Sequence, residues 1–280
     1  TDDHTARPGT GYKQYERRKM TFATGVKSKF WEYEYDAEDP SFPEIPKITP
    51  GESQPDSERV SSFVYPGGIL AVHSQGRGKE AIWRALKNKN VYGTSGPRIL
   101  LWFDLINSPE GKIPMGSEII MSQNPRFTIR AAGSFKQKEG CSNESIDSLS
   151  SERLDYLCAG ECYNPSNERN VIERIEVVKI TPQIYSGESI SPLIQDPWLT
   201  LPCQETGECA VEFEDQNFSR DSVYYVRVIQ EATPAINGVP LSHKDGFKLC
   251  KGSFRTDLQD NCLSMTNERA WSSPIYINKP

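Results

Sequence analysis

The first 140 residues of this 280-residue chain contain no cysteine, and the sequence lacks several other features that define common protein classes. It has no run of about 18 apolar residues, so we expect no membrane-spanning helix. It has no excess of basic residues, because 32 lysines and arginines face 38 acidic residues, so we expect no nucleic-acid partner. The chain opens at Thr1 without a methionine or the apolar segment of a signal peptide. We therefore expect a globular protein that neither spans a membrane with a helix nor binds nucleic acid.

Two kinds of enzyme motif are also missing. No Gly-x-Ser-x-Gly elbow exists to present a nucleophilic serine. The glycine pairs Gly9-Thr-Gly11 and Gly76-Arg-Gly78 lack the lysine and serine that end a phosphate-binding loop. The sequence therefore favours neither a serine hydrolase nor a nucleotide-binding protein.

All seven cysteines lie between Cys141 and Cys262. Cys158 and Cys162 approach the spacing of metal ligands, but the other spacings suit short loops closed by disulfides, which we favour over zinc. Disulfides indicate an oxidising compartment, so we expect an exported protein that is extracellular or periplasmic, with one cysteine left over. The expected pairs are Cys203–Cys209, Cys250–Cys262 and Cys141 with either Cys158 or Cys162.

The pattern of the chain changes near residue 97. Residues 36–58 carry five prolines among acidic side chains, typical of a surface linker or a lid. Residues 68–74 then read as a buried strand, 79–90 as a helix with Ala81, Ile82, Ala85 and Leu86 on one face, and 91–92 as a strand. This βαβ-like order is typical of an α/β barrel or an open sheet.

Beyond Arg98 the apolar residues alternate, which favours a β-sandwich. We therefore expect an α+β protein with two parts: residues 1–97 as an α/β part, either a barrel or an open sheet, and residues 98–280 as the sandwich. The turn Thr94–Pro97 is the expected hinge. The strand-like segments are Ile99–Leu105, Phe127/Ile129/Ala131, Ile175/Val177, Val211/Phe213, Tyr224/Val226/Val228 and Ile275/Ile277.

The motif Asp2-x-His4 could supply an oxygen and a nitrogen ligand to one metal ion. Together with the blocks that follow, it resembles the C-terminal part of the PHP-type (polymerase and histidinol phosphatase) metal-dependent hydrolases, in the subgroup known as domain of unknown function 3604. The resemblance covers nearly the whole chain. It is carried by TARPGTG (5–11), GGILAVH (67–73), EAIWRAL (80–86), VYGTSGPR (91–98), PMGS (114–117), YYVRV (224–228) and ERAWSSPI (268–275).

The resemblance implies a distorted β/α barrel with metal ions at the strand ends, of which residues 1–97 would be the last part, followed by a β-sandwich over residues 98–280. It also implies three sets of metal ligands: an early His-x-His, intermediate residues, and a late Asp-x-His that Asp2 and His4 match. The earlier sets have no counterpart in this sequence. We therefore expect the missing N-terminal part of the barrel as the partner of this chain, with zinc, manganese or iron bound in the complete protein. The chain alone is expected to be inactive.

Such a site would hydrolyse an ester, phosphoester or amide-like bond of a small-molecule substrate with metal-activated water. Arg7 and Arg98 could hold an anionic substrate, although each could instead form a surface ion pair. His73 ends its predicted strand, where it could move a proton or serve as a hydrogen-bonded structural residue. The alternative function is a non-catalytic extracellular binding or assembly module built on the same fold.

Overall fold

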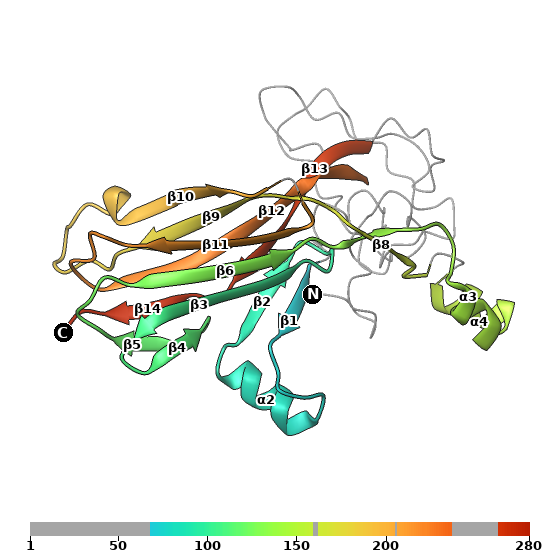
Figure 1. Cartoon of the computed structure of the whole chain (residues 1–280), viewed down its shortest axis with the longest axis horizontal. Helices are drawn as coiled ribbons and strands as arrows, with labels where there is room; N and C mark the ends of the chain where they lie inside the picture. Colours follow the sequence, from blue (N-terminus) through green and yellow to red (C-terminus); the bar gives the residue numbers. More distant parts are fainter. Residues whose placement is uncertain (1–67, 159–161, 205, 237–262) are drawn as a thin grey trace, which may run out of the picture. The chain divides into compact units, whose positions relative to one another are not determined.

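The computed structural model describes residues 68–158, 162–204, 206–236 and 263–280 (Figure 1). They fall into two compact units. The first unit includes 137–158, 162–166, 232–236 and 263–266, and the second comprises 69–136, 167–231 and 267–280. Several predictions lie outside the described residues: those on Asp2, His4 and Arg7, on the segment 36–58, and on the pair Cys250–Cys262.

The first unit contains two short helices. Ser142 caps the first of them, because its hydroxyl accepts a hydrogen bond from the amide of Ser145 at 3.3 Å. Near them, Asn164 donates its backbone N–H to the side chain of Gln137 at 3.1 Å and its side-chain amide to the carbonyl of Glu139 at 3.0 Å. A disulfide joins Cys141 to Cys162. The helices are α3 (Asn143–Ser148) and α4 (Ser151–Cys158).

Strands dominate the described residues, and two sheets make up most of the second unit. The larger has eight strands in the order β1-β2-β13-β12-β14-β5, with β9 on the other side of β12 and β10 beside β9. Its strands are β1 (Ile69–Val72), β2 (Val91–Thr94), β5 (Glu118–Ile120), β9 (Ile172–Ile180), β10 (Ile194–Pro202), β12 (Ser222–Ile236), β13 (Leu263–Ser272) and β14 (Ile275–Asn278).

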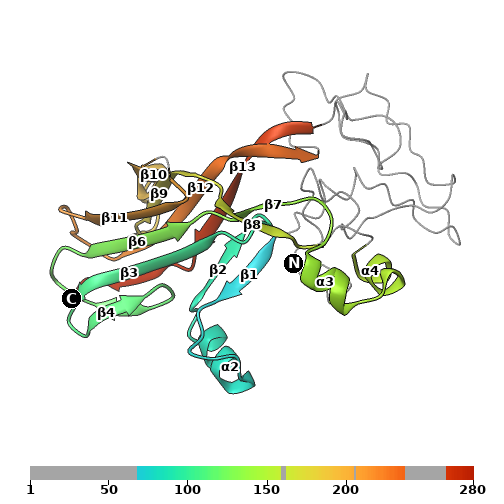
Figure 2. The same ribbon diagram turned by 45° about the vertical axis from the view of Figure 1, so that its right-hand side comes forward.

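The smaller sheet runs in the order β11-β6-β3-β4, and β7 pairs with β8 in a third, two-stranded sheet. Figures 1 and 2 show β3, β6 and β11 side by side. A 3-10 turn, η2 (Ser191–Leu193), leads into β10. The remaining strands are β3 (Leu100–Ser108), β4 (Gly111–Pro114), β6 (Arg126–Ala132), β7 (Phe135–Gln137), β8 (Pro165–Arg169) and β11 (Glu208–Glu214).

The two main sheets share one apolar core, which gives the unit a sandwich-like arrangement. Phe127 of the smaller sheet is fully buried in this core. The centre of its ring lies 5.3 Å from that of Phe103 in the same sheet and 4.9 Å from that of Tyr224 in the larger sheet. The alternation seen in the sequence explains this core, since every second residue of a strand faces the same side. The expectation of strands around Phe127, Ile175, Tyr224 and Ile275 is confirmed.

Residues 69–94 do not form the expected parallel unit. β1 pairs directly with β2 in antiparallel register, from Ile69 opposite Thr94 to Val72 opposite Val91, so the segment is a hairpin with a helix, α2 (Lys79–Lys87), in its loop (Figure 2). A parallel crossover needs the helix to pack on the face of the sheet. In α2 only Ala85 is buried, and the backbone N–H of His73 extends the antiparallel ladder to the carbonyl of Asn90 at 2.9 Å.

β1 and β3 lie in different sheets, as a boundary near residue 97 requires, but β2 joins the larger sheet by pairing with β13. Residues 69–136 also fall in one compact unit. The division at residue 97 and the barrel part of the expected fold therefore stay predictions. Among the described helices, none has the length and hydrophobicity to cross a bilayer.

Candidate functional site

Two sequence blocks that carry the family resemblance, 91–98 and 268–275, lie next to each other in the second unit. β2 pairs with β13 in antiparallel register, with Thr94 opposite Ala270 and Tyr92 opposite Ser272. The backbone N–H of Ser273 then bonds to the carbonyl of Val91 at 3.1 Å. These blocks are therefore neighbouring strands, although more than half of the chain separates them.

The centre of this junction is a buried carboxylate. Glu268 is 3% exposed and accepts a hydrogen bond from the hydroxyl of Ser95. The same hydroxyl accepts the backbone N–H of Arg269 at 2.9 Å, and the N–H of Ser95 bonds to the carbonyl of Arg269 at 2.9 Å. Ser95 is thus fixed by both strands, which gives it a structural role in holding β13 against the turn after β2.

A third block, 114–117, completes the junction. Gly116 has a φ of +87°, and a Cβ placed on it would lie 2.3 Å from the carbonyl oxygen of Lys89, so only glycine fits there. Its N–H bonds to the carbonyl of Pro274 at 2.9 Å, and the side chain of Asn90 donates to the carbonyl of Met115 at 3.0 Å. The motif PMGS therefore joins the end of the hairpin loop to the segment before β14.

His73 lies close to this junction, just after β1. Its Nε2 is 2.7 Å from the carbonyl oxygen of Leu101, to which it can only donate, and its ring is 5.3 Å from that of Tyr92 and 5.8 Å from that of Trp102. The Tyr92 hydroxyl donates to the carbonyl of Ile99 at 3.1 Å. Burial raises the pKa of Tyr92, so this hydroxyl stays a donor. This hydrogen bond of His73 is the kind of contact expected for a structural histidine.

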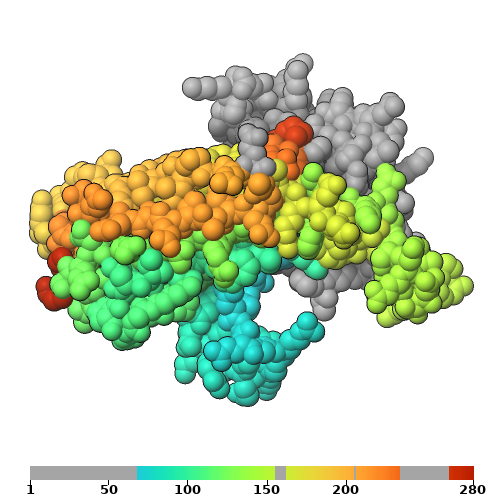
Figure 3. All heavy atoms as spheres, in the orientation of Figure 1, coloured from blue at the N-terminus to red at the C-terminus, as the bar shows by residue number. Residues whose placement is uncertain are grey.

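Arg98 is exposed two residues before β3 and three residues before Leu101, whose carbonyl His73 contacts. The loop between β1 and α2 borders an open hollow of about 510 Å³. Figure 3 shows the atoms around α2 (cyan) standing out from the rest of the second unit. The hollow is lined by Val72, Ser74, Gln75, Gly76, Arg77 and Ile82.

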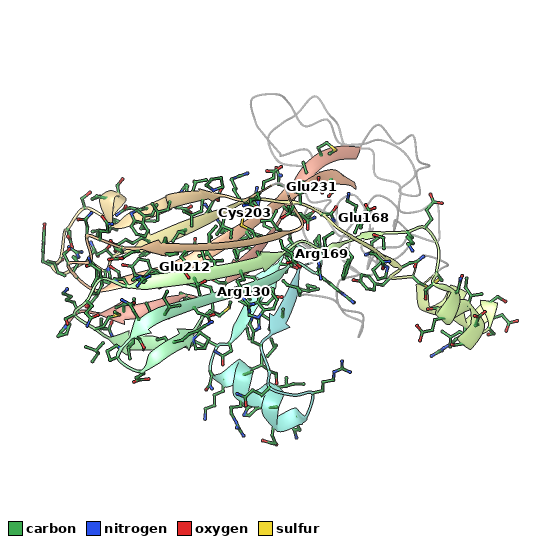
Figure 4. The ribbon with its side chains drawn as sticks, viewed as in Figure 1. Arg130, Glu168, Arg169, Cys203, Glu212 and Glu231 are labelled. Atoms are coloured by element: carbon green, nitrogen blue, oxygen red, sulfur yellow. A yellow bond between two sulfur atoms is a disulfide. The ribbon has the colours of Figure 1, made fainter. Side chains whose placement is uncertain are left out.

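The outer face of the smaller sheet carries charged side chains. Figure 4 labels Arg130 on β6 and Glu212 on β11, both exposed. The Arg130 guanidinium lies 4.8 Å from the centre of the Trp102 ring, and Arg126 lies 4.0 Å from Glu212 and 3.9 Å from Glu214. Ion pairs this exposed are worth little, so this face reads as solvated surface.

The sequence analysis missed a buried charged cluster in the core. Lys179 of β9 forms an ion pair with Asp215, and the hydroxyl of Tyr224 donates to the same carboxylate. These residues are 8%, 1% and 0% exposed. A signal was present, since Lys179 continues the alternation Ile175/Val177 and Asp215 continues Val211/Phe213, so both occupy positions of the inward face.

Metal ligands cannot be assembled from the described residues, where no three His, Cys, Asp or Glu side chains lie together. The carboxylate of Asp2 and the imidazole of His4 fit a divalent metal by donor type. The structure contains the disulfide Cys203–Cys209, as expected, and the disulfide Cys141–Cys162, which is one of the two alternatives expected for Cys141. They are compatible with an oxidising extracellular or periplasmic environment.

Part of the chain matches a known protein family. Residues 1–138 match the family described as protein of unknown function (DUF3604). The match includes Asp2 and His4 as well as the hairpin, the turn 94–97 and the block 114–117. A search of curated proteins and a search of solved structures each found no match.

Proposed function

We propose that this chain is part of an exported metal-dependent hydrolase of the PHP type and supplies the late metal-binding motif together with a disulfide-linked β-sandwich. The observation that carries the proposal is the family match over residues 1–138, because it includes the Asp2-x-His4 motif and the blocks that resemble this subgroup. The two disulfides support export.

Asp2 and His4 are the proposed ligands of this chain. When bound, the metal supplies an activated water for hydrolysis of an ester, phosphoester or amide-like bond. Arg7 and Arg98 are the proposed cations that hold an anionic substrate. A hydrolytic metal usually has three or more protein ligands, so the remaining ligands belong to the earlier part of the barrel.

The test compares this chain alone with the chain joined to the segment encoded before it. Metal content after dialysis and hydrolysis of a simple aryl phosphate are measured for both. We expect both properties in the joined protein and neither in the chain alone, because two ligands on one short segment bind metal weakly. Asp2→Ala and His4→Ala should abolish both properties. Asp3→Ala, which changes the carboxylate between them, is the matched control and should keep them.

Stoichiometric metal on the isolated chain, or full activity of both variants in the joined protein, would contradict the proposal.

The second candidate is a non-catalytic binding module, and one observation favours it. Helix α2 exposes Trp83, which is 63% accessible, beside Ile82 and Leu86. Exposed apolar clusters of this kind are typical of contact surfaces. Under this alternative, Asp2→Ala and His4→Ala leave the affinity for a binding partner unchanged, whereas Trp83→Ala lowers that affinity.

A further inference from the structure

The cluster at Lys179 places an amine and a carboxylate in contact inside the core. Lys179 lies opposite Tyr224 in the register of β9 and β12, and its Nζ lies 5.2 Å from the centre of the Trp198 ring and 5.8 Å from that of Tyr224. Asp215 follows the last residue of β11 and is 1% exposed. A buried ion pair carries a large desolvation cost, which the attraction between the charges offsets only in part.

The hydrogen bonds around Asp215 also polarise its carboxyl group. Oδ1 accepts the backbone N–H of Asn217 at 3.0 Å, and Oδ2 accepts the hydroxyl of Tyr224 as well as Nζ of Lys179. A donor on one oxygen stabilises the negative charge that develops when a nucleophile attacks the carboxyl carbon, and a donor on the other helps that oxygen leave. A desolvated lysine is an effective nucleophile once it has lost its proton.

From this geometry we propose that Lys179 and Asp215 form an isopeptide bond, an amide between the two side chains. The ammonium of Lys179 transfers one proton to the carboxylate, and Nζ then attacks Cγ of Asp215. The N–Cγ bond forms while the bond from Cγ to Oδ2 breaks, and Oδ2 leaves as water with two of the three ammonium protons. The ion pair and the products are both neutral overall, and no oxidant or other reactant is needed.

The surroundings favour the amide over the ion pair. The reaction replaces two buried charges by one neutral amide, which removes their desolvation cost. The aromatic rings of Trp198 and Tyr224 limit the return of water, so the reverse hydrolysis is suppressed. Burial and the carboxylate of Asp215 raise the pKa of Tyr224, so its hydroxyl keeps its proton and remains a donor.

The bond would connect the two sheets at one end of β11. Lys179 belongs to the larger sheet, and Asp215 directly follows β11 of the smaller sheet. Near the other end of the same strand, the disulfide Cys203–Cys209 joins the segment after β10 of the larger sheet to β11 (Figure 4). The strand β11 would thus be covalently tied to the opposite sheet at both ends.

Mass spectrometry of the purified full chain tests the proposal without any mutation. After reduction and alkylation, we expect an intact mass one water below the mass calculated for the sequence with its cysteines alkylated. The chain has no lysine or arginine between Lys179 and Arg220. Trypsin should therefore leave residues 175–220 as one peptide, lighter by one water and uncut after Lys179, because the enzyme does not cleave at an acylated lysine.

Two results of the same experiment would overturn the proposal. A full sequence mass with cleavage after Lys179 overturns the proposal. A mass lower by one water with normal cleavage after Lys179 also overturns it, since that pattern indicates dehydration at another place. Lys179→Arg and Asp215→Ala should restore the full mass of each variant. Lys136→Arg, which changes the exposed partner of Glu168, is the matched control and should keep the deficit.

Discussion

Helix α2 and the interior of the sandwich distribute their side chains in opposite ways. The helix exposes apolar residues, with Trp83 at 63% and Leu86 at 38%, whereas the interior buries the charged pair Lys179–Asp215. Apolar exposure costs little in the folded chain, but a buried charge must be compensated by its partners. Stability therefore resides in the interior, whereas α2, in which only Ala85 is buried, contributes little to it.

The largest loss of stability is expected from a substitution in the interior, compared with a similar substitution on α2. Phe127→Ala removes a fully buried ring that contacts Phe103, Phe213 and Tyr224, and should lower the free energy of unfolding by about 3–5 kcal/mol. Trp83→Ala on α2 is the control, since it removes an aromatic ring from the surface and should change stability by less than about 0.5 kcal/mol. Urea unfolding of both variants measures the difference. Equal losses would show that Trp83 is as deeply packed as Phe127.

The same contrast explains which parts of the fold the sequence could predict. Alternating apolar residues were sufficient to predict β6, β9, β12 and β14, because each of these strands presents one face to the core. The pairing direction of residues 69–94 could not be predicted. The pattern strand–helix–strand is the same for a parallel crossover and for a hairpin with a helix in its loop, and the difference depends on whether the helix packs on the sheet.

The site was only partly predictable for a related reason. Motifs such as VYGTSGPR and ERAWSSPI were visible in the sequence, but their contact through Ser95 and Glu268 depends on the pairing of β2 with β13 across most of the chain. Lys179 and Asp215 continue apolar alternations, which places them on the inward face. Their contact with each other depends on the packing of two sheets, which local patterns do not determine.

A smaller loss of stability is expected from removal of the disulfide Cys203–Cys209 near the start of β11. Replacing Cys203 and Cys209 together by serine removes a disulfide with a sequence separation of 6. Because a short loop constrains the unfolded chain only modestly, the loss should be about 2 kcal/mol. Urea unfolding without reductant measures it. With reductant present, the wild-type protein and the variant should unfold at nearly the same urea concentration, and a difference as large as before would contradict the assignment to the disulfide.

The smallest effect should come from an ion pair outside the core, and it should depend on pH. Glu188 accepts hydrogen bonds from Arg220 at 2.8 and 3.1 Å and from the backbone N–H of Ile184 at 2.9 Å. The hydrogen bonds from Arg220, and next that from Ile184, lower the pKa of Glu188 in the folded protein. The folded chain therefore binds fewer protons at this site than the unfolded chain, so the stabilisation is complete above the unfolded pKa and is lost as the pH falls through the folded pKa.

Glu188→Gln removes this contribution while keeping the shape of the side chain. Wild type should be the more stable protein at neutral pH, and its advantage should shrink on acidification and vanish below the folded pKa of Glu188. Unfolding free energies of both proteins across this pH range measure the change. Arg220→Gln provides the control background, because without the guanidinium the main cause of the shift is absent and the effect of Glu188→Gln should become nearly independent of pH. An advantage of wild type that grows as the pH falls would reverse the sign and refute the assignment.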